Sequence, residues 1–437
     1  MADYDACIRR RLGLDPTADH ADVQTARSSR LAAAIAAART TSPFYRRRTD
    51  WPAGPVDGAA DLPRLPFTTP EDLARADPPL VAVSGADVAR IVTLPTSGTS
   101  GTPKRIAFGL AELEATVDYF HHGMAIFTEA GDRVAIAFAS DRPASVGDGL
   151  ALALKRLGAI PLRLDVADDP AALVAALRHE GPDVVAGPPV TLLAAARLSA
   201  ADGGPPIRLK AVLVSSDYAA PSLKRAIVQA WDCAVHDHWG MTETGYGGAV
   251  DCPAHLGLHL READLFVEVI DPATGRGLPP GEEGEIVIST LQPRATPLVR
   301  YRTGDIGRLV DAPCACGSHT SRLVGLRGRI RDEVVLGDGL RLALADIDDV
   351  VFGIDGVSDV EASVTVGPSA TLALRLAAPP LLRSPALAEA VRRAVAAAPA
   401  WGHAVASGRL RLEVTVGDTV RFTRAEKRRL HHEVFHA

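Results

Sequence analysis

Short apolar runs alternate with longer segments of helical periodicity over much of the first half of the chain. The runs predict strands at 133–139, 159–164, 183–186 and 209–214. Helices are predicted between and around them, at 111–127, 147–157, 170–179, 190–198 and 222–231. Strands that alternate with helices of this length are typical of a parallel sheet covered on both faces.

The pattern changes at about residue 265, where shorter β runs are separated by turn-forming clusters. Strands are predicted at 265–270, 284–290, 298–302 and 307–310. Beyond residue 329, helices at 345–352 and 385–398 and strands at 357–366 and 370–376 predict a small α+β domain. We therefore predict an α/β fold: an N-terminal domain (1–328) of parallel and mixed sheets covered by helices, with a β-rich subdomain at about 250–328, and a C-terminal domain (329–437).

Composition narrows the class of protein. A chain of 437 residues with 47% hydrophobic and 23% charged residues is typical of a globular protein of two or three domains. A net charge of −6 favours no nucleic acid partner, and no apolar run approaches the roughly 20 residues that span a membrane. The N-terminus lacks a basic segment followed by an apolar one, so a cytoplasmic location is expected. The sequence is also compatible with a homodimer.

Candidate chemistry begins at residues 96–104, T-S-G-T-S-G-T-P-K, which follow an apolar run at 88–94 that we interpret as a buried strand. Glycines let backbone N–H groups turn toward an anion, hydroxyls add donors and the lysine adds positive charge, so the composition is that of a polyphosphate cradle. A flexible linker is the plainer alternative, but a linker does not explain the preceding strand and the single lysine. The predicted nucleotide-binding residues here are Thr96, Ser97, Gly98, Thr99, Ser100, Gly101 and Lys104.

This segment resembles the phosphate loop of the adenylate-forming (acyl-CoA synthetase) superfamily, whose members convert a carboxylic acid and ATP into an acyl-adenylate. S-P-F-Y at 42–45 and L-P-F-T-T-P-E-D-L at 65–73 resemble signatures of its phenylacetate-CoA ligase branch. The resemblance implies that the C-terminal domain is a mobile lid.

Three later segments repeat the resemblance in the same order along the chain. W-G-M-T-E at 239–243 resembles Y-G-x-T-E, with Trp replacing the usual Tyr; V-R-Y-R-T-G-D at 299–305 resembles Y-R-T-G-D; and G-R-I-R-D at 328–332 resembles the G-R-x-x-D hinge. An acidic residue beside a triphosphate suits Mg²⁺, so Glu243 is predicted to bind magnesium and Thr242 a phosphate oxygen. Taken alone, these two residues would be read as a helix-capping threonine and a solvated glutamate.

The resemblance also implies further nucleotide contacts. Asp305 would hold the ribose hydroxyls and Arg329 would reach the ribose or the α-phosphate, with a pivot at Arg331 and Asp332. The alternative is that these arginines belong to a basic turn exposed to solvent. The other predicted nucleotide-binding residues are Ser215, Ser216, Asp217, His238, Trp239, Gly240 and Met241.

Near the C-terminus, R-F-T-R-A-E-K-R-R at 421–429 loosely resembles P-R-T-x-x-G-K, which implies a catalytic role for Lys427. A lysine there would stabilise the charge that develops during adenylation. The alternative is a basic helix face. The segment after the hinge departs from the family pattern at 336–344, so the resemblance does not define the acceptor of the acyl group.

A separate set of thiols and imidazoles fits a closed tetrahedral zinc site. We predict Cys252, His259, Cys314 and Cys316 as ligands, with His255 and His319 as substitutes for the histidine. Four protein ligands would make the ion structural. Buried free cysteines are the alternative.

The predicted acid pocket contains Tyr119, Phe120, Tyr218, Gly245 and Tyr246, with His121 or His122 near a polar substituent. Its aromatic residues favour an aryl acid, although such residues also occur in cores. The predicted function is an ATP- and Mg²⁺-dependent ligase that forms an acyl-adenylate and transfers the acyl group to CoA. The alternatives are an adenylating enzyme with an amine or nitrite as acceptor, and a non-catalytic nucleotide-binding homologue.

Overall fold

The computed structural model describes residues 1–52, 54–77, 79–94, 103–140, 142–164, 169–337, 339–367, 369–417 and 428–434. The chain forms two compact units: unit 1 comprises Met1–Phe127 and His238–Leu326, and unit 2 comprises Thr128–Asp237 and Arg327–Ala437. The chain enters unit 2 for the last time directly after Leu326. The domain division after residue 328 stays a prediction.

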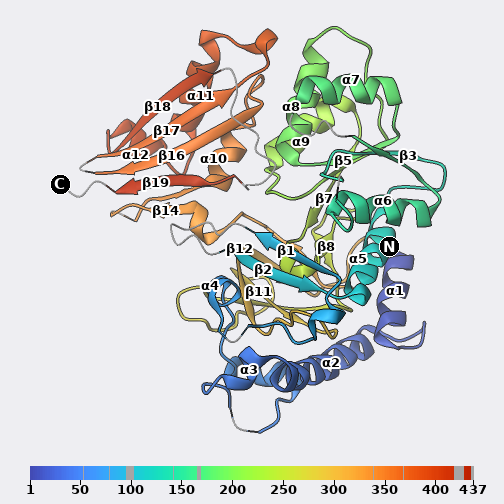
Figure 1. The fold of residues 1–437 in the computed structure, drawn as a ribbon. Helices are drawn as coiled ribbons and strands as arrows, with labels where there is room; N and C mark the ends of the chain where they lie inside the picture. The colour runs from blue at the N-terminus through green and yellow to red at the C-terminus, as the bar shows by residue number, and fades with distance from the viewer. Residues whose placement is uncertain are drawn as a thin grey trace. The chain divides into compact units, whose positions relative to one another are not determined.

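The described residues of unit 1 form antiparallel β structure and the helices α1 to α5 (Figure 1). Its larger sheet has the strand order β10-β11-β12-β13-β9-β8, in which neighbouring strands are antiparallel. The strands are β8 (Ala249–Val250), β9 (Leu258–Leu260), β10 (Leu265–Ile270), β11 (Glu283–Thr290), β12 (Tyr301–Val310) and β13 (Arg322–Val324), and the helices are α1 (Ala2–Leu12), α2 (His20–Thr41), α3 (Pro43–Arg47), α4 (Pro70–Arg75) and α5 (Leu110–Met124).

Two predictions in unit 1 were wrong. The runs at 298–302 and 307–310 are not separate strands, because β12 continues through Thr303–Gly304–Asp305. A register shift between Glu285 and Val287 of β11, together with φ = +75° at Gly304, accommodates these residues within the pairing. The strand before the cradle, β1 (Arg90–Leu94), is not buried: it forms a hairpin with β2 (Lys104–Phe108), and Ile91 is 59% exposed.

Unit 2 contains the predicted parallel sheet, with strand order β7-β6-β5-β3-β4. Its strands are β3 (Arg133–Ile136), β4 (Ile160–Arg163), β5 (Val184–Gly187), β6 (Ala211–Val214) and β7 (Ala234–Trp239), and its helices are α6 (Val146–Leu157), α7 (Pro170–Glu180), α8 (Pro189–Ala201) and α9 (Pro221–Trp231). The last two residues of β7, His238 and Trp239, belong to unit 1 and pair with β8.

Local sequence explains where these helices begin and end. The Ser145 side chain accepts the backbone N–H of Asp148 at the start of α6, and the Asp169 carboxylate caps α7. Gly158 and Gly181, both with positive φ, follow the two helices and provide left-handed C-caps.

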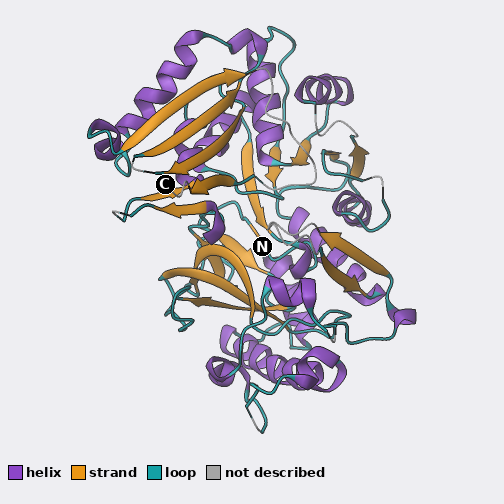
Figure 2. Cartoon of the chain, turned by 60° about the vertical axis from the view of Figure 1, so that its left-hand side comes forward, coloured by secondary structure: helices purple, strands orange, loops and turns teal. Residues whose placement is uncertain are grey.

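The C-terminal part of unit 2 forms a four-stranded sheet, β18-β17-β16-β19, beside α11 (Figure 2). The elements after the hinge are β14 (Glu333–Val335), β15 (Arg341–Ala343), α10 (Leu344–Val351), β16 (Asp359–Val366), β17 (Ala370–Ala377), α11 (Pro385–Ala397), α12 (Gly402–Ala406), β18 (Leu410–Gly417) and β19 (Leu430–Val434). Strands β18 and β19 were not predicted; the parallel pairing of each with a central strand decides their conformation.

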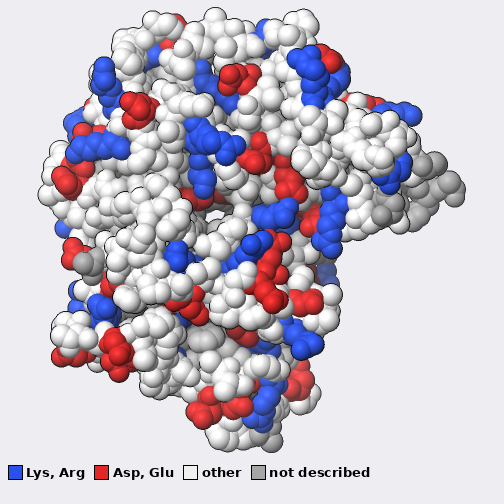
Figure 3. Space-filling view, turned by 180° about the vertical axis from the view of Figure 1, so that it is seen from behind, with Lys and Arg blue, Asp and Glu red and all other residues white. Residues whose placement is uncertain are grey.

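Each unit has its own apolar core, which contains Leu31, Phe108 and Tyr301 in unit 1 and Leu223, Val391 and Trp401 in unit 2. Acidic and basic side chains are interspersed over the face seen in Figure 3. Within the described part of the chain, no helix combines the length and the apolar character needed to cross a bilayer.

Candidate adenylation site

Three segments of unit 1 meet at the carboxylate of Glu243. Lys104 is the first residue of β2, Glu243 lies on the short 3₁₀ helix Thr242–Thr244, and Tyr301 begins β12. The Lys104 ammonium donates to Glu243 Oε1 at 2.6 Å, and the Tyr301 hydroxyl donates to the same oxygen at 2.9 Å. The lysine that ends the cradle is therefore paired with the glutamate of the second motif.

Glu243 is 4% exposed, and burial by itself would raise the pKa of its carboxyl group. The positive charge of Lys104 and the hydrogen bonds from Lys104 and Tyr301 outweigh burial and hold this pKa below its usual value. Glu243 is therefore ionised at neutral pH, which is the state that a Mg²⁺ ligand would require.

The second and third motifs are joined directly. Trp239 Nε1 donates to Asp305 Oδ2 at 2.8 Å, and Asp305 is 8% exposed. The Asp305 backbone N–H also donates to the Thr303 hydroxyl at 3.0 Å. The indole that replaces the usual Tyr thus orients the carboxylate predicted to hold the ribose.

Glycines permit close packing around Trp239. A Cβ on Gly248 would lie 2.5 Å from Trp239 Cζ3, and a Cβ on Gly240 would lie 2.5 Å from the Tyr246 carbonyl oxygen. Met241 is buried beside them, and burial lowers the pKa of neighbouring His238 to about 4. His238 is therefore neutral at physiological pH.

The predicted aromatic residues of the acid pocket in unit 1 fall into two separate groups. Tyr119 and Phe120 of α5 contact the His238 ring, with centroid distances of 5.9 and 6.3 Å. Tyr246 instead stacks on Phe108 at 5.4 Å. Gly245 precedes Tyr246 with φ = +75°.

The other predicted contacts belong to unit 2. Ser215, Ser216 and Asp217 directly follow β6, where Ser216 has φ = +81°, and Tyr218 follows them. The Asp217 carboxylate accepts the backbone N–H of Arg428 at 3.2 Å. Arg329 precedes the 3₁₀ helix Ile330–Asp332, so the predicted pivot has a helical turn.

Two predicted groups lie outside the described residues: the cradle residues Thr96 to Gly101, and Lys427. Their roles stay predictions.

Sequence reasoning missed part of the support around Glu243. Tyr301 belongs to a recognised motif, but its hydroxyl received no role. Half-buried Arg294 donates to the carbonyl oxygens of Glu243 and Thr244, at 3.2 and 3.4 Å, and so holds the turn that carries the carboxylate. A charged residue among the prolines and small residues at 293–297 was the available signal.

The four predicted zinc ligands come together in unit 1. The donor atoms of Cys252, His259, Cys314 and Cys316 lie within 4.8 Å of one another. Cys252 Sγ is 3.9 Å from Cys314 Sγ, and Cys316 Sγ is 3.4 Å from His259 Nε2. Ligands at 2.0–2.3 Å from a tetrahedral ion are about 3.3–3.8 Å apart, so the set fits zinc.

Of the three candidate histidines, His259 lies with the cysteines. His259 Nδ1 contacts the Thr320 hydroxyl at 2.6 Å, which leaves Nε2 directed at the cysteines. His255 Nδ1 instead contacts Asp251 at 2.5 Å, and among the described residues neither His255 nor His319 joins the four-residue cluster.

The sequence of this chain matches a known protein family. Residues 23–292, more than half of the chain, match the family described as AMP-binding enzyme. The chain belongs to this family of AMP-binding enzymes. Its relatives include phenylacetate-coenzyme A ligases of Thermus thermophilus, 29% identical over 67% of both chains, and of Pseudomonas putida, 27% identical over 73% of both chains. The resemblance to the superfamily and to its phenylacetate-CoA ligase branch is confirmed.

Solved structures support the fold class. 2-Hydroxyisobutyryl-CoA ligase in complex with 2-HIB-AMP has a TM-score of 0.77 at 23% identity, covering 95% of this chain and 90% of that one. The same ligase with 2-HIB-AMP and CoA has a TM-score of 0.63 at 24% identity, covering 96% and 91%. The predicted α/β fold is confirmed.

Proposed function

We propose that this chain is an ATP-dependent ligase that activates a carboxylic acid as its acyl-adenylate and transfers the acyl group to CoA. A carboxylate oxygen of the acid attacks the α-phosphorus of ATP, the bond to the β-phosphate breaks and pyrophosphate leaves. The CoA sulfur then attacks the acyl carbon, a proton is lost from the thiol and AMP departs. The observation that carries the proposal is the Lys104–Glu243–Tyr301 cluster in the same unit as the Trp239–Asp305 pair.

Each residue of this arrangement has a proposed role. Glu243 would hold Mg²⁺, which neutralises phosphate charge when bound, and its ionised, buried carboxylate fits that role. Lys104 would neutralise phosphate oxygens together with the cradle residues, and Thr242 would contact a phosphate oxygen. Asp305 would accept the ribose hydroxyls, with Trp239 holding it in place and offering a flat face to the base or the acid.

The remaining roles rest on family resemblance. Lys427 would stabilise the charge developing between carboxylate and α-phosphate, and Arg329 would contact the ribose or that phosphate. Ser215, Ser216 and Asp217 would face adenine, and Arg331 with Asp332 would form the pivot between the two half-reactions. Zinc held by Cys252, His259, Cys314 and Cys316 would be a structural clip.

An aryl acid is the proposed substrate class. The relatives named above are phenylacetate-coenzyme A ligases, and the residues around the proposed pocket of unit 1 are Tyr119, Phe120 and Tyr246. His238 remains neutral beside Tyr119 and Phe120, so it adds no charge against an apolar ring.

The test is exchange of labelled pyrophosphate into ATP, driven by a panel of aryl and alkyl acids. We expect strongest exchange with an aryl acid and formation of its CoA thioester. Exchange by no acid, with ATP still bound, would indicate a non-catalytic homologue. AMP formation that needs an amine or nitrite but not CoA would show that the acceptor is not CoA.

A further inference from the structure

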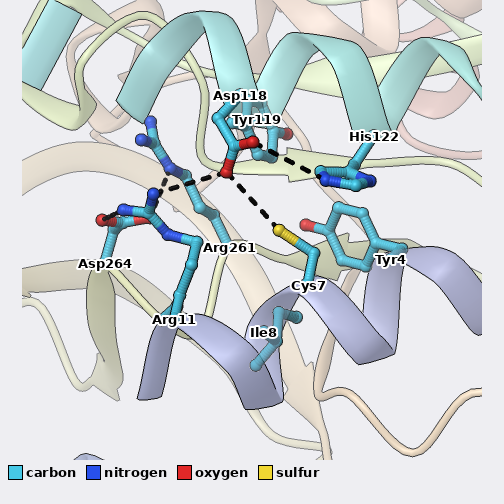
Figure 4. A pocket seen from close by; sticks show the side chains of 10 residues that line it. Tyr4, Cys7, Ile8, Arg11, Asp118, Tyr119, His122, Arg261 and Asp264 are labelled. Atoms are coloured by element: carbon cyan, nitrogen blue, oxygen red, sulfur yellow. Dashed lines mark hydrogen bonds and ion pairs between the residues drawn. The ribbon is translucent and has the colours of Figure 1, made fainter. Parts of the chain in front are cut away.

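A small cavity lies between α1 and α5, and two residues predicted near the acid pocket, Tyr119 and His122, also line it. Figure 4 shows Cys7 of α1 facing Asp118 and His122 of α5 across it. Its volume is about 20 Å³. A cavity of roughly 10–15 Å³ already accommodates a water molecule, so this one suits a single ion or water and excludes an organic ligand.

The three side chains have the geometry of metal ligands. Cys7 Sγ lies 3.5 Å from Asp118 Oδ2, and His122 Nε2 lies 3.6 Å from Asp118 Oδ1. Their donor atoms lie within 4.8 Å of one another. Both separations fall within the roughly 3.3–3.8 Å between ligands of one tetrahedral zinc ion. Asp118 and His122 are four residues apart, so they share one face of α5.

A cation already occupies part of this space. One terminal nitrogen of Arg10 lies 3.3 Å from Cys7 Sγ and 3.3 Å from His122 Nε2. Arg10 is exposed, so its side chain can move into solvent. Arg11 lies 3.4 Å from Asp118, but it also pairs with Asp264 at 2.5 Å, which offsets its charge.

A second observation indicates a missing partner. Tyr119 lines the cavity and is only 5% exposed, and its hydroxyl has no hydrogen-bond partner among the described residues. The same holds for one terminal nitrogen of Arg261, which is 4% exposed. A buried polar group left without a partner is costly, so water or an ion-bound water in the cavity is expected.

The geometry points to a transition-metal site for Zn²⁺ or a similar divalent ion, formed by Cys7, Asp118 and His122 and separate from the Cys252 cluster. A thiolate, a carboxylate and an imidazole suit such an ion and together balance its charge. Three protein ligands leave the fourth position for water in the cavity. The ion ties the N-terminal helix to the helix that carries Tyr119 and Phe120.

The experiment measures metal per chain on full-length protein, stripped with chelator and reconstituted with Co²⁺ or Zn²⁺. We expect Cys7→Ala to hold one ion fewer than Cys233→Ala, a control that removes another buried thiol far from the cluster along the chain. Thiolate-to-cobalt absorption should fall in Cys7→Ala and not in the control. Both variants keep the cluster that contains Cys252, so metal bound there contributes equally to the two and cancels from the difference in metal content.

Two conservative variants keep the test valid if Cys7→Ala fails to fold. Asp118→Asn and His122→Gln should each weaken binding of this ion by about 100-fold, at least the loss caused by removing a supporting residue of a metal site. Arg10→Ala should keep the stoichiometry and bind more tightly. Equal metal content in Cys7→Ala and Cys233→Ala, or an unchanged affinity of Asp118→Asn for the metal, would overturn the proposal. The contact between Cys7 and Asp118 would then be only a hydrogen bond between a thiol and a carboxylate.

Discussion

Lys104 and Glu243, 139 residues apart in the chain, are joined by a hydrogen bond of 2.6 Å. Glu243 is 4% exposed, and Tyr301 of a third segment donates to the same carboxylate oxygen. Scattered positions for these residues would have excluded a common nucleotide site. Their contact instead brings the last residue of the cradle to the motif assigned to magnesium.

Glu243→Gln should reduce acid-dependent pyrophosphate exchange by about 100- to 1000-fold, because it removes a preorganised charge from the phosphate site. Lys104→Met should also reduce exchange, and the double variant should lose less than the sum, with a coupling of roughly 0.5–3 kcal/mol. Glu262→Gln is the matched control, since it breaks a buried pair with Arg27 outside these motifs of unit 1. Additive losses would mean that the observed pair does not act as a unit.

Trp239→Phe should raise the KM for ATP roughly tenfold with a smaller effect on kcat, because buried Asp305 loses an indole donor worth about 1–3 kcal/mol. Steady-state kinetics with ATP varied would measure this. Trp231→Phe removes a similar bond, from Trp231 Nε1 to Ser199 at 3.0 Å, and should leave this KM unchanged. An unchanged KM in Trp239→Phe would show that this hydrogen bond does not support ATP binding.

Gly247→Ala should raise the KM for an aryl acid, since the new Cβ would lie 2.1 Å from Tyr119 Cε1 and force that ring to move. Gly277→Ala is the control, because its Cβ would meet no atom within 4 Å. Acid dependence of pyrophosphate exchange distinguishes them. If both variants had the wild-type KM, Tyr119 would be a core residue and not part of the acid pocket.

Cys314→Ser should lower the metal content by one ion per chain and the Tm by about 5 °C or more, as expected when a metal that binds only the folded state is lost. Cys233→Ser, in unit 2, should keep the metal. Elemental analysis and thermal unfolding measure the two effects. A variant with wild-type metal content would contradict the zinc assignment.

Stability should fall as the pH rises from about 4 to about 6 because of two buried carboxyl groups in unit 2. Burial raises the pKa of Asp348 and of Asp359 to about 6, although Arg428 lies between them and opposes the shift. The folded chain therefore binds more protons than the unfolded chain between about pH 4 and pH 6, and this stabilisation is lost as the pH rises through 6.

Asp359→Asn should weaken that pH dependence and leave Arg428 paired with Asp348. Urea unfolding at about pH 4, 5, 6 and 7 measures the free energy of unfolding across the range in which these groups titrate. Asp202→Asn is the control. The hydrogen bond from Arg178 lowers the pKa of the Asp202 carboxyl group to about 2, so this group stays ionised between pH 4 and pH 7. A wild-type pH dependence in Asp359→Asn would show that Asp359 does not titrate in this range.

Periodicity and turn chemistry determined most elements in the order in which they occur. Strand Leu265–Ile270 was predicted to the residue, and α6, α7 and α9 within one residue at each end, because caps such as Ser145 and Asp169 are local signals. The motifs at 239–243 and 299–305 could also be identified from the sequence, since their residue types are those that magnesium and ribose binding require. The composition of the cluster of Cys252, His259, Cys314 and Cys316 could also be inferred from its cysteines.

Only the tertiary structure decided what depends on contacts between distant segments. Pairing with β11 makes β12 one strand, and pairing with β16 and β17 creates β19 and β18. The choice of His259 over His255, the bond from Trp239 to Asp305 and the approach of Cys7 to Asp118 follow from packing and not from sequence spacing. A local pattern states which groups a segment offers, whereas burial and pairing of distant segments determine which of those groups meet.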